Sequence, residues 1–422
     1  MKTFMEKLRI VFTDKSLRTR IFLTLGILAL SRLLASIPIP GIDVSELQNF
    51  LSNQFIGLLN IFSGGGLSNL SVVMLGVGPY ITASIIMQLL TMMSPKLKAM
   101  YQEEGQAGRL KFTQISRILT VPLALVQAFS FLAILQRQGV ISPLVGFDLV
   151  SNLIVITGGS LLLMWLGELV TEFGIGNGVS LLIFSGIVAG LPQIIGREAF
   201  VFSAAKIPLY FGFLVVAMLI VVGVVIITEA ERPIPITYAR RVRGMKVYGG
   251  VSTYLPLRIN QAGVIPIIFA LSILLLPQMA LSFLSGVGNE VFQKISSALL
   301  ALLSNGWVYA GLYFILVFLF TYFYTAVTFD PNTISSNLQK NGAFIPGVRP
   351  GQPTSEYIAK VLTRITLVGA LFLGIIAVLP LAMRALTNTP SLAIGGTALL
   401  IVVSVVLDLM KKVDAQISMR EY

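Results

Sequence analysis

The charged residues of this chain favour ionic recognition over bond-making chemistry. Five cationic side chains gather in two polar loops that are rich in Pro and Gly: Arg240, Arg241, Arg243, Lys246 and Arg349. Guanidinium and ammonium groups bind carboxylates and phosphates, so such loops suit an acidic protein surface or ribosomal RNA. The chain has no Cys and no His. That composition argues against thiol, disulfide, zinc and imidazole acid–base chemistry, so we expect no cofactor and no enzyme.

Motifs typical of nucleotide binding or proton transport are also missing. The run Gly-Ile-Gly-Asn-Gly at 174–178 lacks the spacing of a dinucleotide fingerprint and the Lys-Ser/Thr of a P-loop. We predict that it forms a tight turn between two spans. The acidic residues Glu168, Glu172 and Asp408 fall at the predicted ends of apolar segments. A carboxylate at mid-depth would be expected in an ion-coupled transporter, and none is predicted there.

The composition predicts the elements that must carry these loops. Of the 422 residues, 55% are hydrophobic and 11% are charged, and the mean hydropathy is +0.88. A soluble domain could not bury that much apolar surface, so we predict an integral membrane protein. Spanning a bilayer core of roughly 30 Å takes about 20 helical residues. Segments of this kind lie at 21–38, 72–93, 118–136, 152–170, 178–195, 207–228, 261–284, 307–329, 361–383 and 391–410.

These runs are too long and continuous for the alternating strands of a barrel. The predicted fold class is therefore an all-α membrane protein with ten transmembrane helices. Most of the 30 Lys and Arg residues lie in the N-terminal segment, the even-numbered loops and the C-terminal tail. By the positive-inside rule, both termini are predicted to be cytoplasmic. Contact with anionic lipid accounts for part of the net charge of +12, but the cluster at 240–246 is denser than lipid contact requires.

Ten spans divide into two halves of five. We predict an N-terminal half at 1–195, an external hinge at 196–206 and a C-terminal half at 207–422, with docking loops at 229–258 and 330–357. Because five is odd, the second half would cross the membrane in the opposite sense, as in an inverted repeat.

One apolar segment, at 55–70, is too short and too rich in glycine to span. It is predicted either to be an external loop lying on the bundle or to be a short re-entrant helix inside a cavity. Two apolar pairs share helix faces one turn apart, Val77 with Ile81 and Val179 with Ile183. From spacing alone, ordinary helix packing is the favoured interpretation of both pairs. The amides of Gln88 and Asn260 are candidates for hydrogen bonds across a helix interface.

Several motifs, in this order, resemble those of bacterial SecY, the pore subunit of the Sec protein translocase. They lie at 38–41 (Pro-Ile-Pro-Gly), 62–65 (Phe-Ser-Gly-Gly), 79–90, 164–168 (Met-Trp-Leu-Gly-Glu), 174–178, 260–266 and 342–351. The resemblance runs from about residue 4 to residue 415. It implies a central protein-conducting channel that passes unfolded secretory polypeptides across the membrane and releases transmembrane segments laterally into lipid.

The resemblance also assigns roles to residues. A constriction ring would comprise Val77, Ile81, Val179, Ile183, Ile268 and Ile401. A plug at about 58–70 would include Leu58, Asn60, Phe62, Ser63, Gly64, Gly65 and Gly66. A lateral gate between spans 2–3 and 7–8 would contain Gln88 and Asn260, and Arg349 would match the family's central loop arginine.

The implied partners are the SecE and SecG subunits, the SecA ATPase, the ribosome, polypeptides with signal sequences and membrane lipids. The implied location is the plasma (inner) membrane, and the loop cations would dock the motor or the ribosome. Two other functions stay open from the residues alone. A small-solute secondary transporter with an inverted repeat is the main alternative, and an intramembrane protease or lipid-modifying enzyme is the other.

Overall fold

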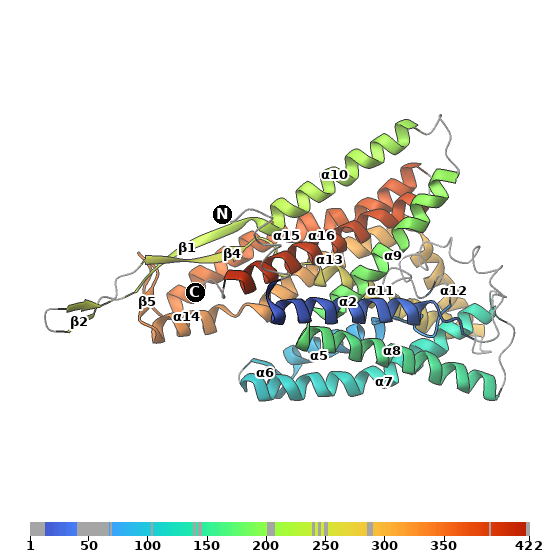
Figure 1. Cartoon of the computed structure of the whole chain (residues 1–422), viewed down its shortest axis with the longest axis horizontal. Coiled ribbons are helices and arrows are strands. Elements are labelled where there is room, and N and C mark those ends of the chain that lie inside the picture. Colours follow the sequence, from blue (N-terminus) through green and yellow to red (C-terminus); the bar gives the residue numbers. More distant parts are fainter. Residues whose placement is uncertain are drawn as a thin grey trace.

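The computed structural model describes residues 13–39, 67, 70–102, 104–137, 141, 146–200, 207–238, 241–243, 246–248, 252–284, 290–387 and 390–418. Helices overlap all ten predicted spans. They are α2 (Lys15–Ala35), α5 (Gly78–Met93), α7 (Gly105–Arg137), α8 (Phe147–Phe173), α9 (Gly178–Phe200), α10 (Ile207–Glu229), α11 (Ile265–Leu284), α13 (Gly306–Thr328), α15 (Gln352–Thr387) and α16 (Pro390–Ser418). Figure 1 shows these helices running side by side in one elongated bundle.

Within the described residues, five helices are both long enough and apolar enough to cross a membrane. They lie in α7, α8, α10, α13 and α15. This finding supports an all-α, multi-pass membrane protein, whereas the count of ten spans stays a prediction. α10 has the highest hydropathy of the five and is the least buried, so the rest of the chain leaves most of its apolar surface uncovered.

Three shorter helices were not predicted: α6 (Pro95–Gln102), α12 (Glu290–Ser304) and α14 (Pro331–Lys340). Each lies between two spans and contains no apolar run of about 20 residues that would predict a helix. α14 begins after Asp330, whose side chain accepts a hydrogen bond from the Asn332 backbone N–H at 3.0 Å. Asp14 caps α2 in the same way, accepting from Ser16 at 2.8 Å. Such caps satisfy backbone donors that have no partner within the helix.

The loop at 229–258 forms strands, which the sequence analysis did not predict. β1 (Glu231–Tyr238) pairs antiparallel with β4 (Ser252–Arg258), and β5 (Ala343–Phe344) joins the other edge of β1. β2 (Arg241–Arg243) and β3 (Lys246–Tyr248) form a two-stranded hairpin. Proline is rare inside strands because it has no backbone N–H to donate to the hydrogen-bond ladder. For that reason Pro233 and Pro235 argued against a strand at the position of β1. They fit because β5 pairs only with Thr237 and Tyr238, which leaves the edge of β1 beside the prolines open.

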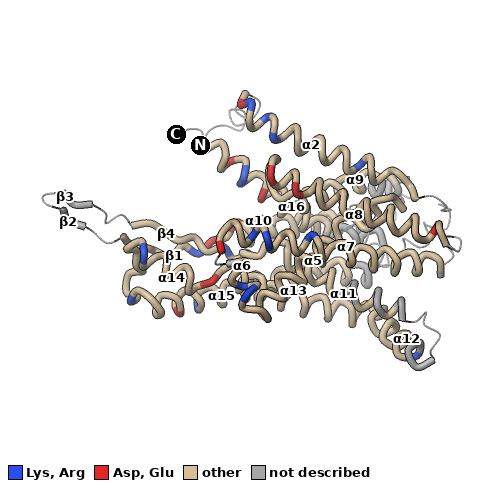
Figure 2. Tube along the Cα trace, turned by 90° about the horizontal axis from the view of Figure 1, so that it is seen from below, with Lys and Arg blue, Asp and Glu red and all other residues tan. Residues whose placement is uncertain are grey.

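The bundle has one large hydrophobic cluster formed by residues of α2, α5, α8, α9, α10, α11, α13, α15 and α16. A second cluster lies around α7 and α8. Figure 2 shows that most charged residues lie toward the end of the bundle that carries the termini and the strands, whereas the opposite end is mostly uncharged.

Candidate functional site: an apolar ring, a cavity and a loop unit

The six predicted ring residues belong to one hydrophobic cluster, to which four helices contribute them. Five side chains are buried, at 1% to 7% exposure, and Val179 is half-buried. α5 packs against α11, and α9 packs against α16. The structure therefore places these side chains together in one apolar cluster.

Three of the four helices begin at the proposed ring. Val77 is the N-cap of α5, Val179 is the second residue of α9, and Ile268 is the fourth residue of α11. Ile401, by contrast, lies well inside α16. The positions of the ring side chains therefore depend on the turns that precede these helices.

The turn at 174–178 between α8 and α9 is tight, as predicted, and it fixes the start of α9. The Thr171 hydroxyl donates to the Gly167 carbonyl at 2.9 Å and accepts from the Gly178 N–H at 2.9 Å. A Cβ on Gly178 would collide with the Gly167 carbonyl oxygen. From α2, the Thr24 hydroxyl accepts a hydrogen bond from the Ile175 N–H at 3.2 Å. Val179 thus lies at the close contact between the start of α9 and α8.

The segment before α5 is held in a similar way. Its helix begins at Gly78 rather than at residue 72, so the predicted span was six residues too long at that end. Gly76 adopts a positive φ of 58°, which breaks the helical geometry, and Pro79 suits a helix start because the first turn needs no N–H donor. The Ser160 hydroxyl of α8 donates to the Gly76 carbonyl at 2.9 Å. Gly159 has no room for a Cβ beside the Val72 carbonyl oxygen.

A cavity of about 250 Å³ lies next to the ring. It is lined by Ser180 and Leu181 on α9, by Val264 and Ile265 at the start of α11, and by Ser404 and Val405 on α16. Each pair lies within about one helical turn of a ring residue, namely Ile183, Ile268 or Ile401. The cavity lining is therefore followed by a ring residue along three helices, and the ring residues themselves do not line the cavity.

The rest of the cavity lining mixes apolar side chains with polar groups, including the amides of Asn177, Asn260 and Gln261. Its three cationic residues are each paired with a carboxylate. Lys411 lies 2.8 Å from Glu229, Lys412 lies 2.9 Å from Asp408, and Arg258 lies 3.1 Å from Glu231. The cations of the lining are thus balanced by carboxylates.

The two predicted gate amides lie on α5 and just before α11. Gln88 donates from Nε2 to the Ser84 hydroxyl of its own helix at 3.3 Å, and its Oε1 atom is buried without a hydrogen-bond partner. Asn260 is 7% exposed, and its Oδ1 atom also lacks a partner. The structure gives no hydrogen bond between these two amides. α11 packs against α5, α7 and α13, which are the neighbours expected of a gate helix.

The predicted plug lies mostly outside the described residues: this holds for Leu58, Asn60, Phe62, Ser63, Gly64, Gly65 and Gly66. Its end is described at Leu67 and Leu70, both fully buried in the second hydrophobic cluster. Leu70 has a φ of 40°, which is unusual for leucine. Its carbonyl accepts from the Ile39 N–H at 2.9 Å, and Pro38 and Ser71 form a β-bridge. The chain after the predicted plug is therefore fixed to the end of α2.

The two predicted docking loops form one structural unit, which we call the loop unit (residues 229–258 and 330–357). β5 of the second loop pairs with β1 of the first. A small separate core joins them, with buried side chains at Ile234, Leu257, Ile345, Ile358 and Val361. Ile358 and Val361 come from α15, which extends nine residues beyond its predicted start and supports the loop unit.

Arg349 is exposed on a rigid part of the loop unit. Gly347 and Gly351 on either side have positive φ values of 83° and 98°, which glycine adopts without strain. The Thr354 hydroxyl donates to the Arg349 carbonyl at 2.8 Å, and the Ser335 hydroxyl donates to the Gly351 carbonyl at 2.6 Å. The backbone of Arg349 is thereby held in one pose.

The other predicted docking cations lie near the hairpin. Arg241 and Arg243 are in β2, and Lys246 is in β3, where it is paired in register with Arg243. Arg240 lies outside the described residues, as does 201–206 of the predicted hinge. The rest of that hinge, 196–200, belongs to α9.

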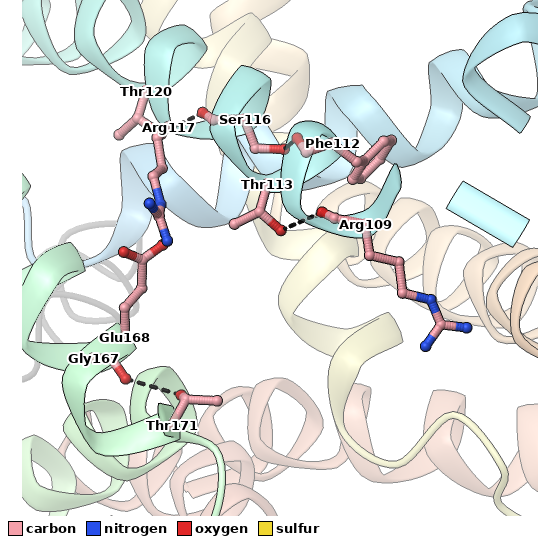
Figure 3. A network of polar contacts seen from close by, with 9 residues as sticks. All are labelled: Arg109, Phe112, Thr113, Ser116, Arg117, Thr120, Gly167, Glu168 and Thr171. Carbon is pink, nitrogen blue, oxygen red and sulfur yellow. Dashed lines mark hydrogen bonds and ion pairs between the residues drawn. The ribbon is translucent and has the colours of Figure 1, made fainter. Parts of the chain in front are cut away.

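An ion pair that the sequence analysis did not predict connects α7 and α8. Arg117 Nε lies 2.6 Å from Glu168 Oε1, with the side chains 44% and 18% exposed (Figure 3). On α7, Thr113, Ser116 and Thr120 each donate a hydroxyl hydrogen bond to the carbonyl four residues earlier. Glu168 therefore serves as an ion-pair partner between two helices.

Comparison with known proteins agrees with this architecture. Residues 71–410 match the family model described as SecY. The protein translocase subunit SecY of Mycobacterium tuberculosis is 43% identical over 449 aligned positions, which cover 100% of this chain and 99% of the relative.

Two solved structures share the fold. One is described as the structure of a protein-conducting channel, with 19% identity and a TM-score of 0.61 over 94% of this chain and 91% of that chain. The other is Sec61 in the canine ribosome–channel complex from the endoplasmic reticulum, with 18% identity, a TM-score of 0.61 and the same coverage. The chain thus has the fold of these two solved structures. The chain belongs to the SecY family, whose members are the protein-conducting channel of the translocase.

Proposed function

We propose that the six ring residues form the constriction of the channel and that the cavity beside them is its entrance. One observation carries this proposal: on three helices the cavity lining gives way to a ring residue within about one turn. A polypeptide would enter from the end where the termini lie and pass between the aliphatic side chains.

The chemistry of the two regions suits this division. Aliphatic side chains offer no hydrogen bonds to water or ions, so a narrow ring of them loses water and resists ion flow. The entrance pairs its cations with carboxylates, and it therefore has little excess charge with which to retain a charged polypeptide. In the closed state of the channel, the segment at about 58–70 would act as the plug on the far side of the ring.

We assign the lateral gate to the contact of α11 with α5 and α7. Gln88 on α5 and Asn260 just before α11 each have a buried amide oxygen without a hydrogen-bond partner. An unsatisfied buried polar group costs about 1–3 kcal/mol, so the closed interface is weaker than an apolar one would be. An apolar segment in the channel would leave through this gate, favoured by about 0.8 kcal/mol per buried CH₂ group.

The loop unit is the proposed docking surface for the SecA ATPase and the ribosome. The exposed Arg349 on a rigid backbone supports this assignment, and a fold neighbour is described within a ribosome–channel complex. The chain itself would be passive, with energy supplied by the partner. SecE and SecG would be its membrane partners in the plasma (inner) membrane, and both termini and the loop unit would be cytoplasmic.

The absence of natural Cys permits a direct test. A single Cys replaces Ile183 or Ile401, and a secretory protein carrying one Cys is stalled partway through the channel. We expect a disulfide at both positions that depends on stalling. Leu319→Cys is the control, because Leu319 lies on α13 with 56% exposure and faces lipid. With the substrate stalled, a missing disulfide at both ring positions, or an equal yield at Leu319→Cys, would overturn the ring assignment.

A further inference from the structure

α12, the 15-residue helix between α11 and α13, has no role in the channel as proposed above. It packs against both neighbours and lies at the end of the bundle opposite the termini and the strands (Figures 1 and 2). At 1.5 Å per residue it is roughly 22 Å long, which is too short to span a bilayer core of roughly 30 Å.

Its described side chains fall into stripes. Ile295, Leu299 and Leu302 are 52%, 44% and 51% exposed, and their spacing places them on one helical face. A neighbouring stripe faces the protein, with Ser296 buried and Leu300 half-buried.

The third stripe of α12 is polar. Lys294 and Ser297 are exposed and lie one turn apart. The helix therefore presents an exposed apolar face beside an exposed polar one. That pattern is typical of helices lying in the plane of a membrane interface.

We propose that α12 lies in the membrane interface on the side opposite the termini, with Ile295, Leu299 and Leu302 inserted into lipid. The occupant of this face is lipid because α13, which packs against α12, also exposes large apolar side chains and is apolar enough to cross a membrane. Trp307, three residues after α12, is 75% exposed, and Leu312, Ile315 and Leu319 on α13 are 36%, 53% and 56% exposed. Tryptophan is enriched at such interfaces because its ring is apolar and its N–H is polar.

The position of α12 in the membrane interface would affect the channel through the helices that contact it. α12 packs against α11, the helix assigned to the gate, and against α13. Lipid contact at α12 therefore holds the ends of two neighbouring helices, one of which, α11, is assigned to the gate.

Tryptophan quenching tests the proposal without requiring translocation, so its failure would leave the ring proposal untouched. The chain has only two Trp residues, and Trp165→Phe with Trp307→Phe gives a silent background. Leu299→Trp is then compared with Ser297→Trp, its match on the polar stripe. Both are reconstituted in phosphatidylcholine vesicles that contain lipids brominated either near the headgroup or deep in the acyl chain. Leu319→Trp on α13 gives the signal of a side chain in the membrane core.

We expect the Leu299→Trp fluorescence to be quenched several-fold more than that of Ser297→Trp, and more by shallow than by deep bromines. Leu319→Trp should show the reverse depth preference. Equal quenching of Leu299→Trp and Ser297→Trp would overturn the proposal. A blue-shifted Leu299→Trp emission that neither lipid quenches would overturn it as well, because protein would then cover the face. Ile295→Trp repeats the test if Leu299→Trp does not fold.

Discussion

The ring side chains and the backbone around Arg349 are held by different kinds of interaction. Ring side chains meet through apolar contact, and three of the four helices that contribute them begin near the ring. In the loop unit, the backbone around Arg349 is held by hydroxyl hydrogen bonds and by two glycines with positive φ. Apolar contacts are non-directional and tolerate rearrangement, whereas hydrogen bonds fix one geometry. The difference indicates a centre that can adapt to its substrate and a rim that keeps one shape for its partner.

The largest effect is expected from charge reversal at the rim. Arg349→Glu should abolish SecA-driven export in reconstituted vesicles while leaving the bundle folded, because it replaces a positioned cation with an anion. Lys340→Glu is the control, since Lys340 is an exposed cation in the same unit. Unchanged export by Arg349→Glu, or an equal loss with Lys340→Glu, would remove the distinction between a rigid binding residue and general surface charge.

A polar group in the ring should impair the ion seal of the closed channel more than it impairs partner binding. Ile183→Asn is expected to raise the ion conductance of resting vesicles about tenfold, because an amide holds water in the constriction. Ile183→Leu should leave conductance unchanged, since it keeps the aliphatic character. Equal conductance in the two variants would mean that Ile183 does not line the closed pore.

The turn that starts α9 offers a test of how the ring is positioned. Gly178→Ala should destabilise the protein by about 1–3 kcal/mol, because its Cβ meets the Gly167 carbonyl. The midpoint of thermal unfolding measures this loss. Gly190→Ala, on the same helix with nothing near its Cβ, should be neutral or stabilising. The same midpoint for both variants would show that the close approach does not fix the turn.

Loss of one hydrogen bond at the rim should have a moderate effect. Thr354→Val keeps the shape of the side chain but removes the donor to the Arg349 carbonyl, at a cost of about 1 kcal/mol. We expect a several-fold weaker binding of SecA and no change in resting conductance. Thr354→Ser, which restores the hydroxyl, should recover binding. Undiminished binding by Thr354→Val, or no recovery with Thr354→Ser, would contradict the role of this bond.

The smallest effect is expected at the ion pair between α7 and α8. Arg117→Gln should lower the stability by at most about 1 kcal/mol, because the guanidinium is 44% exposed and solvent screens the pair. Thermal unfolding at low and high salt measures it. A larger loss of stability that does not depend on salt would show that this ion pair is an important contributor to the stability of the helix bundle.

The spans were predictable because an apolar run of about 20 residues matches the thickness of a bilayer core and rarely occurs elsewhere. The strands of the loop unit were not, since the prolines of β1 argue against a strand unless one edge is open. At the ring, the pairs Val77/Ile81 and Val179/Ile183 fit ordinary packing equally well, and only the family resemblance singled them out. Thr171, Ser160 and Thr354, which position the site, are single hydroxyl residues with no distinguishing pattern in the sequence.

The boundary between cavity and ring on α16 is the most direct test of the account. Single Cys residues at Ser404, Ile401 and Ala398 follow one another at about one turn, from the cavity lining through the ring. A membrane-impermeant maleimide is added to resting channels from the side of the termini. We expect rapid labelling of Ser404→Cys and little labelling of Ile401→Cys and Ala398→Cys. Equally rapid labelling at all three positions would contradict a closed apolar constriction at Ile401.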